Sequence, residues 1–187
     1  MQEIILKARE WALEEIERNL YPKIEGFNFS NKKGQELAEN LGADKDLVLL
    51  GTILMDIKLG ECFQEGKIQE HVQRSVIAVK DFLTKFELNK ETKDKIINCV
   101  EAHHGKNPFR CKEAEICANA DCYRFINTRL FLIFLKEDDT FNTFEELIEF
   151  LDGKLEEKWK TLSLNFCKEE LEKDYKLLKE LIKRTQK

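Results

Sequence analysis

The apolar residues of this chain recur at intervals of three and four from one end to the other, which is the spacing of one helix face. In residues 2–20, for example, Ile5, Ala8, Ala12 and Ile16 follow this spacing. Only two prolines and eight glycines interrupt the 187 residues, and no segment shows the alternation of apolar and polar residues typical of a β-strand. The sequence therefore predicts an all-α fold.

Capping residues and chain breakers divide the chain into about seven or eight helices. Asp44 and Asn89 are typical N-caps, and Thr143 opens a Thr-x-x-Glu capping box. No repeat or linker interrupts the pattern, so we expect residues 1–187 to form a single domain, a helical bundle. A loop is predicted over 23–30, and helices are predicted over 2–20, 31–41, 45–59, 68–86, 90–104, 112–135, 144–158 and 166–184.

The charge and hydropathy of the chain exclude several kinds of partner. The formal net charge is −5 at pH 7, so the chain lacks the basic surface with which a protein binds duplex nucleic acid. No apolar run approaches the roughly 20 residues that cross a bilayer, and the first residues do not resemble a signal peptide. We therefore expect a cytoplasmic protein without a membrane partner, and the sequence leaves its oligomeric state open.

Six cysteines are scattered over segments predicted to be helical, and none forms a Cys-x-x-Cys pair. In a chain without a secretion signal, such residues are expected to be reduced thiols packed as small apolar groups. A zinc site made by Cys111, Cys117 and Cys122 is an alternative, although this spacing is unlike that of known zinc modules.

Two acidic residues stand within apolar helical segments, where a carboxylate needs a compensating partner. Asp56 lies in the apolar run 47–57, three residues after Ile53, and Asp121 lies in the segment 114–126. Each falls on the inward face predicted for its helix. A buried carboxylate is costly unless a metal ion, a cation or several hydrogen bonds compensate its charge.

All three histidines of the chain lie between these two acids. His71 falls eight residues before Val79, and His103 falls three residues after Val100, so both share the apolar face of a predicted helix. His104 follows at once and diverges from His103 by about 100°, but at a helix end it can also turn inward. The sequence therefore predicts that the histidines converge on the buried acids.

These five residues, Asp56, His71, His103, His104 and Asp121, form a candidate metal site. Imidazoles combined with a carboxylate supply the mixed nitrogen and oxygen donors that suit a divalent transition metal, namely Mn, Fe, Ni or Zn. A set of two imidazoles and one carboxylate leaves coordination positions for water or for substrate oxygens.

Four motifs resemble a known family when they are taken in order. Residues 50–57 (LGTILMDI) resemble the "ALLHDIG" helix of the HD-domain superfamily of metal-dependent phosphohydrolases, and 113–123 (EAEICANADCY) resemble the helix that carries its last metal-binding aspartate. Residues 70–75 and 97–105, which hold the three histidines, also resemble segments of that family. The resemblance covers roughly residues 25–185 and implies an HD-domain-like fold.

The chain departs from the pattern of this family at two ligand positions. The doublet histidine is replaced by Met55, and no histidine occurs before His71. A thioether is a weak ligand for the metals that this family uses. In two-metal members the doublet aspartate and two later histidines hold a second ion, and Asp56, His71 and either His103 or His104 match those positions.

The resemblance implies a metal-dependent hydrolase that acts on a small phosphorylated substrate, either a phosphate ester or a nucleotide. A divalent metal would polarise the phosphoryl group, and Asp121 would accept a proton as the general base. Lys58 and Arg124 would neutralise the charge of the phosphate.

The alternative is a catalytically inactive HD-like domain that binds a nucleotide, a metal or a protein partner. The loss of the doublet histidine at Met55 favours this hypothesis. In that case the two acids would be compensated by cations of the chain instead of a metal. The cations available for such ion pairs are Lys58, Arg74, Arg124 and Arg129.

Overall fold

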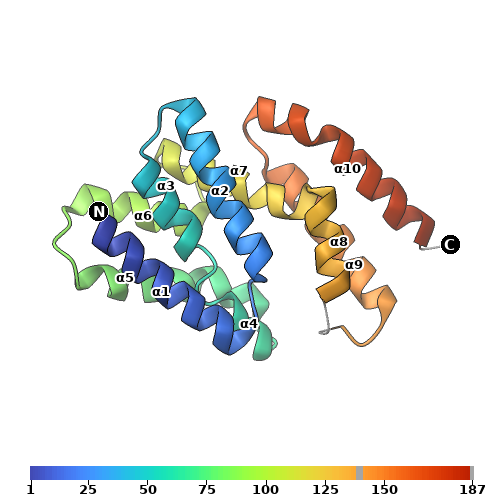
Figure 1. Cartoon of the computed structure of the whole chain (residues 1–187), viewed down its shortest axis with the longest axis horizontal. Helices are drawn as coiled ribbons and strands as arrows, with labels where there is room; N and C mark the ends of the chain where they lie inside the picture. Colours follow the sequence, from blue (N-terminus) through green and yellow to red (C-terminus); the bar gives the residue numbers. More distant parts are fainter. Residues whose placement is uncertain (138–140, 186–187) are drawn as a thin grey trace. The chain divides into compact units, whose positions relative to one another are not determined.

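A computed structural model describes residues 1–137 and 141–185, and these residues form helices without any β-strand. The predicted all-α fold is therefore confirmed, with more helices than expected, and none of those described is long and apolar enough to cross a membrane. The helices are α1 (Gln2–Asn19), α2 (Ile24–Leu41), α3 (Lys45–Leu54), α4 (Leu59–Gln64), a 3-10 helix (Ile68–Glu70), α5 (His71–Thr84), α6 (Lys90–Ala102), α7 (Lys112–Ile126), α8 (Thr128–Glu137), α9 (Phe144–Thr161) and α10 (Asn165–Thr185) (Figure 1).

The chain forms two compact units, Met1–Ala120 and Asp121–Lys187, and the boundary falls within α7. The first unit contains α1 to α6 and the beginning of α7. The second contains the end of α7 and the helices α8 to α10. That the whole chain is one domain stays a prediction.

Helix α3 is the centre of the first unit, where it packs against α1, α2 and α6 (Figure 1). Asp44 begins α3 as expected, because its carboxylate accepts hydrogen bonds from the backbone N–H groups of Asp46 and Leu47. The buried apolar core around α3 draws on every neighbouring helix and includes Ala8, Phe27, Leu47, Leu50, Ile53, Leu54, Val79, Ile96 and Val100.

Several predicted helix boundaries were wrong, among them the end of the helix over 45–59, because α3 ends at Leu54 and Asp56 lies in the turn that follows. The expected loop over 23–30 is the first part of α2, because Phe27 is buried in the core and its burial outweighs the weak helix propensity of the segment. The expected helix over 112–135 is divided at Asn127, whose side chain accepts a hydrogen bond from the N–H of Leu130 and begins α8.

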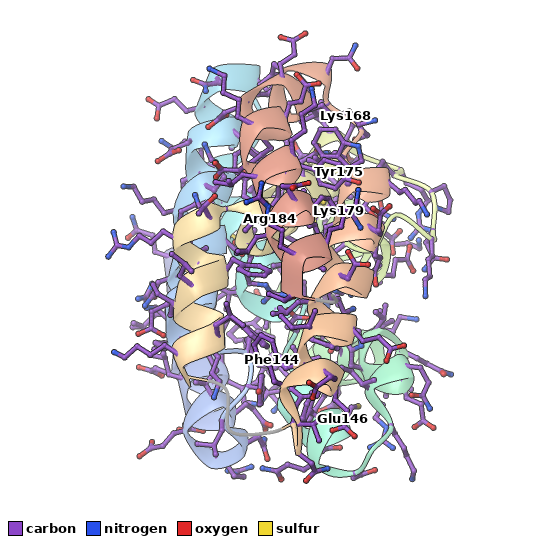
Figure 2. All side chains as sticks on the ribbon, turned by 90° about the vertical axis from the view of Figure 1, so that its right-hand side faces the viewer. Phe144, Glu146, Lys168, Tyr175, Lys179 and Arg184 are labelled. Carbon is purple, nitrogen blue, oxygen red and sulfur yellow. The ribbon has the colours of Figure 1, made fainter. Side chains whose placement is uncertain are left out.

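The second unit contains α9 and α10, which correspond to the last two helices predicted from the sequence. Thr143 begins α9 by accepting a hydrogen bond from the N–H of Glu146, so the predicted capping box is confirmed. Tyr175 and Lys179 of α10, labelled in Figure 2, contact α9: the Tyr175 ring stacks on Trp159, and Lys179 forms an ion pair with Asp152. These contacts join α9 and α10.

Candidate metal centre

Four of the predicted ligands come together at the ends of three helices in the first unit. Asp56 lies in the turn that follows α3, and His71 is the first residue of α5. His103 is the C-cap of α6, and His104 follows it. One potential ligand atom from each of the four side chains lies within 4.8 Å of the others. The convergence of the three histidines on Asp56 is therefore observed.

Three distances within this cluster are close to those between the ligands of one metal ion. Oδ1 of Asp56 lies 3.4 Å from Nε2 of His103 and 3.6 Å from Nε2 of His71. Nε2 of His71 lies 3.1 Å from Nε2 of His104. Ligands that hold zinc at 2.0–2.1 Å in a tetrahedron are separated from one another by about 3.3–3.4 Å. The four side chains can accordingly approach one ion with small movements.

Backbone carbonyl groups hold two of the imidazoles in the tautomer that a metal requires. Nδ1 of His103 lies 2.7 Å from the carbonyl oxygen of Val100, and Nδ1 of His71 lies 2.5 Å from that of Ile68. A carbonyl oxygen can only accept a hydrogen bond, so each Nδ1 carries the proton. The Nε2 of His103 then faces Oδ1 of Asp56, whereas the Nε2 of His71 is hydrogen-bonded to the Nε2 of His104.

This arrangement places electron-rich atoms against one another in a buried site. His103 is fully buried, and among the described residues its Nε2 has no hydrogen-bond partner. A buried polar atom without a partner is costly, and a lone pair that faces a carboxylate oxygen adds repulsion. A cation between the Nε2 atoms and Oδ1 of Asp56 would remove both costs. The donor set therefore fits a divalent transition metal.

Helix dipoles also favour a cation at this position. The C-terminus of α6 ends at His103, and the C-terminus of α3 lies immediately before Asp56. The C-terminus of a helix carries a partial negative charge of about half an elementary charge, which attracts cations and repels carboxylates. The N-terminus of α5 at His71 opposes this effect. Two negative ends against one positive end leave a net preference for positive charge.

A close approach of α3 and α6 positions Asp56 beside His103. A Cβ atom at Gly51 of α3 would lie 2.5 Å from Cβ of Cys99 on α6 and 2.6 Å from Sγ of Cys117 on α7. Only glycine permits this helix separation. A second contact holds the turn after α3, because the N–H of Lys58 donates a hydrogen bond to Oγ of Ser75 on α5.

The side chain of Lys58 is engaged by acids other than Asp56. Its Nζ lies 2.9 Å from a carboxylate oxygen of Glu61 and 3.3 Å from one of Glu15. Burial alone would lower the pKa of Lys58, but the hydrogen bonds and charges of Glu61 and Glu15 raise it overall, so the ammonium stays charged. Its predicted role in neutralising a phosphate stays a prediction.

Asp121 belongs to the second unit, where two cations surround it. Its Oδ2 accepts a hydrogen bond of 2.5 Å from Nζ of Lys158, and its Oδ1 lies 2.8 Å from Nη2 of Arg124. Asp121 and Lys158 are both fully buried. Burial disfavours the charged ammonium, but the charges of Asp121, Cys122 and Glu157 together with the hydrogen bond to Asp121 raise the pKa of Lys158 overall. The sequence had indicated Arg124 as one of the cations available to pair with Asp121.

Lys158 is the buried partner of Asp121 that was not predicted from the sequence. It lies three residues after Leu155 and seven after Leu151, two buried residues of α9, so helical phase alone places it on the apolar face. A lysine at such a position calls for an acidic partner in the core. Whether Asp121 also binds a metal or acts as a general base, and whether Arg124 contacts a substrate, stay predictions.

The cysteines are free thiols, and five of the six are buried. Cys117 donates a hydrogen bond from Sγ to the carbonyl oxygen of Val48. Within the described ranges 1–137 and 141–185, Cys111, Cys117 and Cys122 do not form a group with metal-ligand spacing. The structure gives the alternative zinc site no support.

Comparisons with known proteins agree with this description of the fold. A predicted HD superfamily hydrolase from an uncultured Thermotogales bacterium has a crystal structure similar to this chain, with a TM-score of 0.65 and 14% sequence identity over all of this chain and 91% of the other. The chain therefore has the HD-superfamily hydrolase fold. No family model matches the sequence.

A curated relative is similar to part of the chain. Ribonuclease Y from Finegoldia magna is 38% identical over 85 residues, which is 46% of this chain. The match spans only 15% of the length of that ribonuclease. The predicted resemblance to HD-domain proteins is thus confirmed as a likeness of fold, together with a buried Asp/His cluster that could form a metal site.

Proposed function

We propose that this protein is a metal-dependent hydrolase of a phosphate ester or a nucleotide, with one divalent ion held by Asp56, His71, His103 and His104. The observation that carries the proposal is the buried cluster of three imidazoles around the Asp56 carboxylate, in which the Nε2 of His103 has no hydrogen-bond partner among the described residues. The similar proteins add support, because one is titled a predicted hydrolase and the other is named as a ribonuclease, which acts on a phosphodiester.

The chain's own residues would perform distinct parts of this function. A bound ion of this class would polarise a phosphoryl group as a Lewis acid and would lower the pKa of a water bound to it to about 7. His71 and His103 would hold the ion through Nε2, each fixed by its backbone carbonyl partner. Asp56 would supply the negative charge that makes the site specific for cations. His104 is half-buried, so it would stand between the ion and the solvent from which a substrate arrives.

The predicted catalytic residues fit this function only if the substrate competes with existing partners. Lys58 is paired with Glu15 and Glu61, and Arg124 is paired with Asp121. A phosphate would have to displace a carboxylate to contact either cation. This observation, together with Met55 at the doublet position, favours the second candidate function, a non-catalytic domain that binds a metal, a nucleotide or a protein partner.

Elemental analysis combined with an activity panel tests both candidates. The purified chain would be analysed for Mn, Fe, Ni and Zn, and then assayed against phosphomonoesters, nucleotides and a phosphodiester with each metal added. We expect about one metal per chain and hydrolysis of at least one class. Asp56→Asn should lose the metal and the activity. Asp94→Asn, an exposed acid on α6, is the matched control and should keep both.

The two candidates give different results in this experiment. A bound metal with no hydrolysis of any class would leave the non-catalytic candidate. The absence of metal at saturating concentrations would contradict both the ligand set and the hydrolase, and would identify the cluster as a group of hydrogen-bonded core side chains.

A further inference from the structure

Helix α1 carries a row of leucines on the face opposite its core contacts. Leu6, Leu13 and Leu20 follow one another at intervals of seven residues, and their side chains are 58%, 38% and 59% exposed. Two turns of a helix bring every seventh residue back to nearly the same side, so Leu6 and Leu13 share one face of α1, and Leu20 follows as the C-cap residue at the end of that face, which makes a stripe about 21 Å long. Helix α1, dark blue in Figure 1, lies in the foreground of that view.

This stripe does not follow from the requirements of the core. The core face of α1 is made by Ile4, Ala8 and Ala12 with Glu15 and Asn19, whose side chains are hydrogen-bonded to each other. The sequence analysis placed Ile5 and Ile16 on the core face, but both are only half-buried. These half-buried isoleucines join the core face to the leucine stripe and widen its apolar surface.

Leu20 destabilises the isolated chain through its backbone conformation as well as through its exposure. Its backbone is left-handed, with φ 65°, at the end of α1 where glycine is the favoured residue. A leucine in this conformation is sterically strained, and here its side chain is also exposed to water. Burial of this side chain in an assembly would remove the cost of its exposure and offset the backbone strain.

The charges beside the stripe are arranged for pairing with an antiparallel copy of itself. When two α1 helices are placed antiparallel with Leu13 facing Leu13, Leu6 of each lies opposite Leu20 of the other. The same alignment places Arg9 of each opposite Glu17 of the other. Both residues are exposed, and within the described residues neither forms an ion pair. A shift by one helical turn would instead set a leucine against Arg9.

We propose that α1 is a homodimer interface, on which a second copy of this chain docks antiparallel through Leu6, Leu13 and Leu20. The two-fold axis passes between the two Leu13 side chains, and the pairs of Arg9 and Glu17 fix the alignment. Interfaces of this kind, with one helix from each partner, are smaller than the standard size, so we expect a dimer with a Kd on the order of micromolar.

Sedimentation across a concentration series tests the interface directly. The wild-type chain should change from monomer to dimer as its concentration passes the micromolar range, and Leu13→Glu should stay monomeric. Leu177→Glu is the matched control, because Leu177 is 56% exposed on α10 and lies outside the stripe. This control should dimerise like the wild type. A monomeric wild type, or a Leu13→Glu variant that still dimerises, would overturn the proposal.

Charge reversal tests the antiparallel alignment. Arg9→Glu and Glu17→Arg should each weaken the homodimer by about tenfold, since each places like charges opposite one another twice. The double variant should recover the wild-type affinity. A mixture of the two single variants should form a heterodimer, because each then meets the opposite charge. If neither the double variant nor the mixture recovers association, the alignment is wrong.

Leu20→Gly separates association from folding. Glycine relieves the left-handed backbone, so the variant should unfold at a higher temperature than the wild type at concentrations where both are monomeric. The same variant should dimerise more weakly, because it lacks one end of the stripe. A variant that is more stable as a monomer and dimerises as well as the wild type would contradict the role of Leu20.

Discussion

Replacing Gly51 by alanine should both destabilise the first unit and impair the metal centre. The new Cβ would lie 2.5 Å from Cβ of Cys99, whereas carbon atoms pack at about 3.5–4.0 Å, so α3 and α6 must separate by about 1 Å. Overpacking of this kind costs up to about 3 kcal/mol, and the better helix propensity of alanine offsets about 1 kcal/mol. We expect a net loss of about 2 kcal/mol, or about 4–8 °C in Tm.

The same separation should weaken metal binding, because the contact lies close to two of the ligands. Gly51 precedes Asp56 by five residues, and Cys99 precedes His103 by four. Functional groups must stay within about 0.5 Å of their working geometry, so a movement of this size should lower metal affinity by at least tenfold. Isothermal titration with Zn or Mn, performed well below the Tm of the variant, would measure this loss.

Gly153 provides the matched control. It also lies within a helix, α9, but nothing lies within 4 Å of a Cβ at this position. Gly153→Ala should therefore raise the free energy of unfolding by up to about 1 kcal/mol and leave metal affinity unchanged. If Gly51→Ala were as stable as the wild type and bound metal equally well, close packing of α3 would not be what positions the centre.

Three further predictions concern the metal ligands, the buried ion pair of Asp121 and the Cys122 thiol. Met55→His alone should leave metal content unchanged by elemental analysis, because the earlier family histidine is still absent, whereas His71→Ala should empty the site. Lys158→Met should cost about 3–5 kcal/mol in urea unfolding, since it removes a fully buried partner of Asp121; a smaller loss would make the pair unimportant. Burial raises the pKa of the Cys122 thiol above its ordinary 9.0, so the unfolded chain loses this proton first. Stability should therefore fall above about pH 9, and less steeply in Cys122→Ala.

Local sequence patterns determined the helical class and most helix beginnings. Asp44, Asn89 and Thr143 each accept a hydrogen bond from the first turn of the helix that they were predicted to cap. These interactions span only two or three residues, so they can be recognised without a fold. The inward phase of His71 and His103 was accessible for the same reason, because helical periodicity is a local property.

Tertiary packing decided where local preference was weak. Phe27 extends α2 through a segment of low helix propensity because the core buries its ring. Asn127 divides the predicted helix over 112–135, and the N–H of Thr128 then donates a hydrogen bond to Asp174 of α10, a partner 46 residues away. No window of sequence around Phe27 or Thr128 contains its distant partner, although the cap that Asn127 forms is itself a local interaction.

The partners of buried charges also depended on the tertiary structure. Periodicity placed Asp56, Asp121 and the histidines inward, but it could not choose which side chains face one another. The structure set Asp56 beside three imidazoles and Asp121 beside Lys158. The close approach of α3 to α6 that brings Asp56 and His103 together requires the absence of a side chain at Gly51. Spacing along a helix gives the direction of a side chain, whereas the distance to a partner requires two packed helices.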